Sequence, residues 1–189
     1  ELIVVDTVGE EKTDGSLHVA KEYATKLLRF EWCNNFAAAR NCFVEQASGE
    51  WLLFVDDDEW FEDAQEIIEF FNTGESDRYG QGSYFIRNYS QTGSYNDVPS
   101  VRLVRRTPGT KFVGKIHEQI TETFPPRKEF TCYAHHTGYA FRTKEEREKH
   151  FLRNVPLLEE ELKTKGYTPH LCAQLIQELY SMEQTREKG

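Results

Sequence analysis

Short apolar runs alternate with helical patterns in the first 75 residues. Residues 2–5 form a run rich in β-branched side chains that stops at Asp6, and residues 51–55 form a second run that leads directly into Asp56. Such runs are typical of strands buried in a parallel sheet. Helical spacing is seen at Ala20, Tyr23, Ala24, Leu27 and Leu28, across residues 36–47 with Gly49 as the C-terminal cap, and at Ala64, Ile67, Ile68 and Phe71. The order strand, helix, helix, strand, helix predicts an α/β sheet with helical crossovers.

The middle and the end of the chain follow different patterns. Residues 83–89, 101–105 and 130–135 read as strands without long helices between them, which predicts an antiparallel or mixed extension of the sheet. Helical patterns then begin at Thr143, which forms a capping box with Glu146. Pro156 predicts a kink or break, and the last helix is expected to begin at residues 168–169 with Leu171, Leu175, Leu179 and Met182 facing inward. We therefore expect a domain over residues 1–141 and a helical extension over residues 142–189.

Composition narrows the classes of protein. The 189 residues carry a net charge of -9 without a clustered basic face, so no nucleic-acid partner is expected. The four cysteines show no C-x-x-C spacing, which favours free, buried thiols in a reducing compartment. Apolar runs stay far below the roughly 20 residues of a membrane span, and no signal-peptide pattern is present, so we expect a cytoplasmic protein. The chain opens at Glu1 directly into a strand-like run, which indicates a fragment truncated at its N-terminus.

Four successive acidic residues, Asp56 to Glu59, follow the second apolar run. Ligands of open α/β sheets bind at the carboxyl ends of the strands, where Asp6 and Asp56 would lie together if their strands were parallel neighbours. Asp56 and Asp58 are spaced so that one turn could direct both carboxylates at a Mg²⁺ or Mn²⁺ ion. The alternative is a solvated acidic turn at a helix start, which the helix dipole favours. Because like charges repel unless a cation neutralises them, the pattern favours a metal site.

Several segments match a known family in order along residues 1 to about 165. The segments are IVVDT at residues 3–7, TDG at 13–15, NFAAARN at 35–41, GEWLLFVDDDE at 49–59, FVGKIHE at 112–118 and HTGY at 136–139. With these segments the sequence resembles glycosyltransferase family 2, especially its bacterial branch that glycosylates peptides or cell-surface acceptors. The resemblance implies a GT-A fold, that is, a Rossmann-type mixed sheet, here lacking its first βα unit.

The resemblance also implies roles for individual residues. Glu118 would be the catalytic base. His136 would complete the metal site, with His117 as its rival, and Gly138 could let the backbone approach that site. The implied nucleotide-sugar-binding residues are Asp6, Asp14, Arg40, Asp56 and Asp57, and the implied metal ligands are Asp56, Asp58 and His136.

Simpler interpretations stand beside these roles. Glu118 could be a salt-bridged glutamate, and Arg40 could form a helix-surface ion pair instead of contacting diphosphate. Asn41 could brace a loop, and Arg102 could contact phosphate or lie exposed. His135 and His136 alternate on a strand, so at most one of them faces the site.

The function implied is metal-dependent, inverting transfer of a sugar from a nucleotide-diphosphate sugar, most simply a UDP-sugar. The acceptor would be a peptide, a polysaccharide or a lipid-linked glycan. An unpaired edge strand can pair with a second copy, so a homodimer is compatible with this arrangement. Two other functions remain open on sequence grounds: a metal-dependent nucleotidyltransferase, and a non-catalytic helical module for docking or dimerisation.

Overall fold

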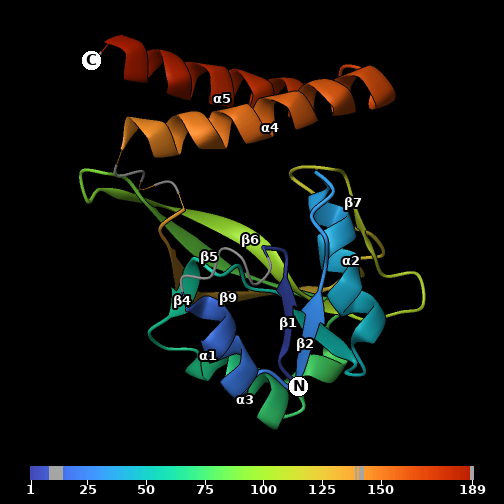
Figure 1. Cartoon of the computed structure of the whole chain (residues 1–189). Helices are drawn as coiled ribbons and strands as arrows, with labels where there is room; N and C mark the ends of the chain where they lie inside the picture. The colour runs from blue at the N-terminus through green and yellow to red at the C-terminus, as the bar shows by residue number, and fades with distance from the viewer. Residues whose placement is uncertain (9–14, 139, 141–142, 188–189) are drawn as a thin grey trace. The chain divides into compact units, whose positions relative to one another are not determined.

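The computed structural model of the chain describes residues 1–8, 15–138, 140 and 143–187 (Figure 1). The chain forms two compact units. Unit 1 combines Glu1–Ser48, Thr110–Thr121 and Thr143–Gly189, and unit 2 combines Gly49–Gly109 and Glu122–Arg142. The helices that the sequence sets apart as an extension thus share a unit with the first 48 residues. The domain division at residue 141 stays a prediction.

The first part of unit 1 contains β1 (Ile3–Asp6), α1 (Ser16–Tyr23), β2 (Lys26–Arg29) and α2 (Phe36–Gln46). The strand predicted at residues 2–5 is confirmed as β1. The helical interpretation of Leu27 and Leu28 is wrong, because both lie in β2, which pairs with β1 in parallel. The helix α1 is only eight residues long and ends at Tyr23, and Ala24 is already extended, so strand pairing decides the conformation that follows. The predicted second helix is confirmed as α2, although its C-terminal cap is Ala47 rather than Gly49.

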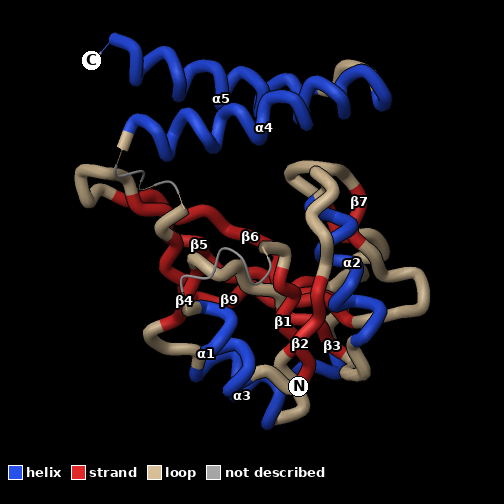
Figure 2. The backbone as a smooth tube through the Cα atoms, in the orientation of Figure 1, coloured by secondary structure: helices blue, strands red, loops and turns tan. Residues whose placement is uncertain are grey.

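The second part of unit 1 contains β7 (Phe112–Val113), β8 (Gln119–Ile120), α4 (Lys144–Lys165) and α5 (Pro169–Glu187). Figure 2 shows α4 and α5 as two long helices that run side by side. The predicted cap is confirmed, since the Thr143 hydroxyl accepts the N–H of Glu146 at 3.1 Å. The prediction that Pro156 breaks the helix is wrong, because α4 continues through this residue.

Packing explains why α4 tolerates its proline. The leucines that follow it are buried in a cluster with side chains from α5 and from the segment between β7 and β8. The members of this cluster are Ile116, Leu157, Leu158, Leu162 and Leu171. Burying several such side chains outweighs the roughly 3 kcal/mol that an interior proline costs a helix. The inward orientation expected for Leu179 is wrong, as 48% of this residue is exposed.

Unit 2 is a mixed five-stranded sheet in the order β3-β6-β5-β9-β4. Its elements are β3 (Trp51–Leu53), β4 (Glu59–Phe61), α3 (Gln65–Asn72), the 3-10 helix η2 (Glu75–Arg78), β5 (Gln81–Tyr89), β6 (Tyr95–Arg105) and β9 (Arg127–His136). Only the β5–β9 pair is parallel among the described pairs of this sheet, so the predicted mixed extension is confirmed. The first two apolar runs do not meet the condition of being parallel neighbours, because β1 pairs with β2, and β3 pairs with β6.

The core of unit 2 lies between α3 and one face of this sheet. Ile67 and Phe70 of α3 pack with Tyr84, Ile86 and other buried sheet residues. The predicted α/β class with a mixed sheet is therefore confirmed. All four cysteines are free thiols. No helix in the described part of the chain has the length and hydrophobicity needed to cross a membrane.

Candidate functional site

The acidic cluster forms a tight turn between β3 and β4. The backbone N–H of Glu59 donates to the carbonyl of Asp56 at 3.0 Å. In return, Oε2 of Glu59 accepts the backbone N–H of Asp56 at 3.2 Å. These two reciprocal bonds fix the turn and leave Asp57 exposed at its corner. Glu59 begins β4 and is buried, whereas the alternative interpretation had it in a solvated turn ahead of a helix.

Arg102, on β6, supplies a positive charge to this turn. Its guanidinium forms ion pairs with Glu59 and, at 3.2 Å, with Oδ2 of Asp56. The Glu59 side chain is 1% exposed. Burial raises the pKa of Glu59, and the Arg102 charge acts in the opposite direction. A protein cation therefore provides part of the neutralisation that the sequence argument assigned to a metal ion.

Asp58 and His136 face each other across the turn and the end of β9. Oδ2 of Asp58 lies 3.3 Å from Nε2 of His136. Nδ1 of His136 is 2.6 Å from Oδ1 of Asn88 on β5. An amide oxygen can only accept, so Nδ1 carries a proton; the second proton of the charged ring sits on Nε2, which can donate it to the Asp58 carboxylate, and in the neutral ring Nε2 carries a lone pair. Although burial alone would lower it, the Asp58 carboxylate raises the pKa of His136.

Gly138 makes room for this pair. A Cβ atom at this position would lie 2.2 Å from Oδ2 of Asp58 and 2.6 Å from Nε2 of His136. Any other residue would force the two groups to move. The expectation that Gly138 permits a close approach at this place is confirmed.

The donor atoms of Asp58 and His136 fit a divalent cation. Two neighbouring ligands at about 2.1 Å from an octahedral ion lie roughly 3 Å apart, close to the separation found here. A carboxylate and a neutral imidazole suit Mn²⁺. Among the described residues, no group of three or more His, Cys, Asp or Glu side chains is arranged to hold a metal. A cation held by Asp58 and His136 would need its other ligands from bound phosphates or water.

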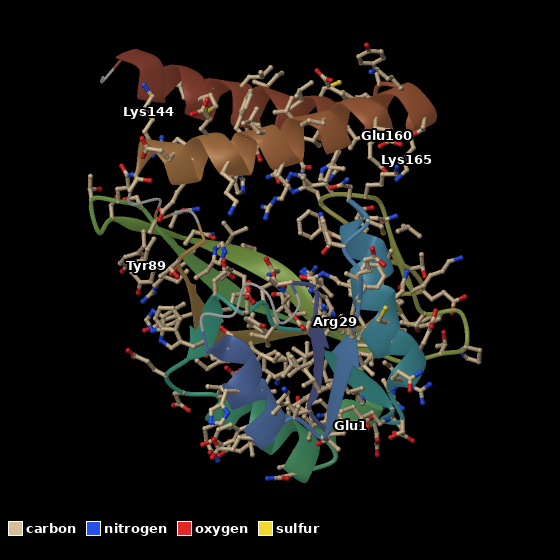
Figure 3. All side chains as sticks on the ribbon, in the orientation of Figure 1. Glu1, Arg29, Tyr89, Lys144, Glu160 and Lys165 are labelled. Atoms are coloured by element: carbon tan, nitrogen blue, oxygen red, sulfur yellow. The ribbon has the colours of Figure 1, made fainter. Side chains whose placement is uncertain are left out.

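His135 points to the opposite face of the sheet from His136. Its Nδ1 lies 2.6 Å from the Tyr89 hydroxyl, and its ring stacks on Trp60 with centroids 4.8 Å apart. Tyr89 is the last residue of β5 and is labelled in Figure 3. The separate partners of His135 and His136 agree with the strand alternation, which allows at most one of the two histidines to face the acidic turn.

Unit 1 carries the other candidate residues. Asp6 ends β1, where its Oδ1 accepts the N–H of Val8 at 3.0 Å and its Oδ2 lies 3.6 Å from Arg29. Asp14 lies outside the described residues. Glu118 forms an ion pair with Arg40 of α2, and the two side chains are 11% and 19% exposed. The interpretation of both residues as ion-pair partners is thus confirmed, while their functional roles stay predictions.

Asn41 and His117, two further residues considered from the sequence, also lie in unit 1. Asn41 bonds both the N–H of Phe112 at 2.7 Å and its carbonyl at 3.0 Å, which confirms the predicted loop brace. His117 has a positive φ of 49°, and burial lowers its pKa. Its buried Nε2 has no hydrogen-bond partner among the described residues.

Sequence reasoning missed Asn88 and the bridging position of Arg102. Asn88 aligns with His136 only through the parallel pairing of β5 and β9, which contains a register shift between Ser83 and Phe85. No local pattern reports such a long-range register. Arg102 was noticed, but its two carboxylate partners depend on the pairing of β3 with β6.

Comparisons with known proteins identify the family of the chain. A sequence model of glycosyl transferase family 2 matches residues 1–142. The prophage-derived glycosyltransferase SunS of Bacillus subtilis is 27% identical over 99% of this chain and 44% of its own length, as is glycosyltransferase SunS of Bacillus phage SPbeta. A TPR repeat-containing protein of Synechococcus elongatus is 31% identical over 65% of this chain and 29% of its own length. The chain thus spans less than half the length of these curated relatives.

Proposed function

Because the chain belongs to glycosyl transferase family 2 and has the mixed α/β architecture of a GT-A-like fold, we propose that it transfers a sugar from a nucleotide-diphosphate donor. A UDP-sugar is the simplest donor. The acceptor is a peptide, a polysaccharide or a lipid-linked glycan, and a divalent cation assists the reaction. The observation that carries the proposal is the arrangement of Asp58, His136 and Gly138 beside the turn of the acidic cluster.

Unit 2 holds the diphosphate end of the donor in this proposal. Asp58 and His136 are the cation ligands, with Asp56, which also pairs with Arg102, as a further ligand. A bound Mn²⁺ or Mg²⁺ would stabilise the charge that develops on the leaving diphosphate. Asn88 holds the imidazole in the tautomer that a ligand needs, a task that usually affects metal affinity 10- to 100-fold. Asp57, exposed at the turn, is assigned to the donor as well.

Unit 1 supplies the base and contacts to the nucleotide. Asp6, Asp14 and Arg40 are assigned to the nucleotide sugar. Glu118 accepts the proton of the acceptor nucleophile as that nucleophile bonds to the anomeric carbon and the bond to the diphosphate breaks. One direct displacement of this kind inverts the anomeric centre. The Arg40 ion pair engages Oε1 of Glu118 and so fixes the orientation of the carboxylate.

Calorimetry with Mn²⁺ and UDP tests the cation site. His136→Ala and Asp58→Asn should each weaken Mn²⁺-dependent UDP binding at least tenfold. Asp77→Asn is the matched control, because the Asp77 side chain is 82% exposed in the same unit. Equal affinity in the His136→Ala variant and the wild type would refute the ligand assignment.

Turnover measurements test the base. Release of UDP from a panel of UDP-sugars should be lost in Glu118→Gln, while the affinity for the donor stays within about twofold, because the substitution removes the proton acceptor and little of the volume. Unchanged turnover in this variant contradicts the role of Glu118.

A further inference from the structure

We propose that Glu161, on α4, is a positioning residue for the catalytic segment that carries Glu118. This inference rests on the base role proposed for Glu118. It assigns a part in the reaction to the C-terminal helices, which lie beyond the 142 residues that match the family model.

The segment of residues 114–118, here called the base loop, contains backbone conformations that need support from outside the loop. Gly114 has a φ of 105° and His117 a φ of 49°, so two of its five residues lie in the left-handed region. For a non-glycine residue this conformation is unfavourable and persists only where surrounding contacts impose it. Contacts from outside the loop must therefore set its shape.

Lys115, at the centre of the base loop, is held from two sides. Its carbonyl accepts the N–H of Phe36, the first residue of α2, at 2.8 Å. Its own N–H donates to Oε1 of Glu161 at 2.9 Å. Since α2 also carries Arg40, the partner of Glu118, one bond connects the base loop to the helix that orients the base and the other connects it to α4.

Glu161 is built for this contact. It is 4% exposed, although a glutamate on a two-helix hairpin could lie in water at no cost. Its second oxygen forms an ion pair with Lys165 one turn later, which fixes the carboxylate from behind. A buried carboxylate with both oxygens engaged accepts a backbone N–H more strongly than a neutral group does.

The neighbouring Glu160 provides a contrast. It also contacts Lys115, but through the Lys115 side chain, and it is 49% exposed. Figure 3 shows Glu160 and Lys165 near the C-terminal end of α4, on the side next to the 110–121 segment. An exposed ion pair of this kind contributes little. Glu160 is therefore a matched control at the adjacent position.

Hydrogen exchange tests the geometry without reference to activity. In Glu161→Leu, amides in the base loop should exchange at least tenfold faster than in the wild type, because the Lys115 N–H loses its acceptor. Glu161→Gln keeps an acceptor oxygen and should protect the loop, as should Glu160→Gln. Leucine favours a helix and position 161 is buried, so α4 should remain folded, which far-UV circular dichroism verifies. Unchanged protection of the loop in Glu161→Leu would overturn the inference.

Kinetics test the consequence for the reaction. With UDP release from UDP-sugars as the readout, Glu161→Leu should lower kcat by about 10- to 100-fold at a nearly constant KM for the donor, since a shift of the base by about 1 Å costs on that order. Glu161→Gln should restore most of kcat. If Glu118→Gln abolishes turnover and Glu161→Leu does not change it, the positioning role is wrong while the proposed function stands. If Glu118→Gln is fully active, the base assignment itself fails, whatever Glu161 does.

Discussion

The buried ion pair between Arg102 and Glu59 leads to a prediction about stability. Replacing Arg102 by methionine retains an unbranched apolar stem but removes the guanidinium group and its charge. The Glu59 carboxylate, 1% exposed, would then remain buried without its principal partner. Removing one member of such a pair typically destabilises a protein by about 3–5 kcal/mol, because an uncompensated charge stays in a low-dielectric environment. In a chain of this size, that corresponds to a decrease in Tm on the order of 10 °C.

A second substitution separates the charge effect from other losses. Adding Glu59→Gln to Arg102→Met removes the stranded charge and retains an oxygen for the N–H of Asp56. The double variant should recover at least half of the free energy of unfolding that the single variant loses. Urea denaturation followed by tryptophan fluorescence and circular dichroism measures both. Arg127→Met, which removes a half-exposed ion pair on β9, should behave as the wild type. A single variant that loses less than about 1 kcal/mol, or a double variant less stable than the single one, would refute this account.

Two further predictions concern the metal site and acid stability. Gly138→Ala should weaken Mn²⁺-dependent UDP binding in calorimetry at least tenfold, because its Cβ would displace Asp58 and His136; wild-type affinity would contradict the crowding argument. Unfolding free energy should fall as the pH drops below about 6.5 and again below about 4.5, as measured by urea titrations at several pH values. Burial lowers the pKa of His117. Burial raises the pKa of Glu178, but hydrogen bonds from side chains of α4 outweigh this and lower it overall. The unfolded chain therefore binds both protons at a higher pH than the folded chain does. His117→Gln should reduce the loss of unfolding free energy that begins at about pH 6.5. An unchanged dependence on pH would show that this histidine is not the source of that loss.

Local signals in the sequence predicted most of the elements of this fold. The apolar runs gave β1 and β3, the strand patterns of the middle gave β5, β6 and β9, and Thr143 marked the start of α4. These features depend on side-chain periodicity and capping within a few residues. The helix α2 was found for the same reason.

The errors in the sequence-based interpretation come from contacts between distant segments. Leu27 and Leu28 have helical spacing, but pairing with β1 places them in a strand. Pro156 is a strong local signal for a break, yet the leucine cluster keeps α4 continuous. The three-residue strand β4 is defined by its pairing with β9 and has no pattern of its own.

The candidate site shows the same limit. The acidic turn could be located from sequence because its residues are consecutive. Its companions Asn88 and Arg102 come from strands far along the chain, so their contacts depend on registers that no local pattern encodes. The pairing of Asp58 with His136 could be anticipated only from the family resemblance.

The discontinuous make-up of unit 1 limits how this protein can be divided or recombined. Its three stretches of chain alternate with the two stretches of unit 2, so no single cut in the polypeptide releases either unit whole. Ile116 contributes to the same apolar cluster as Leu158 and Leu171, so a graft that exchanged the terminal helical hairpin for another would have to bring a matching residue 116 with it. Chimeras that join different helices to residues 1–142 should therefore retain their solubility only when residue 116 and the helices come from the same parent.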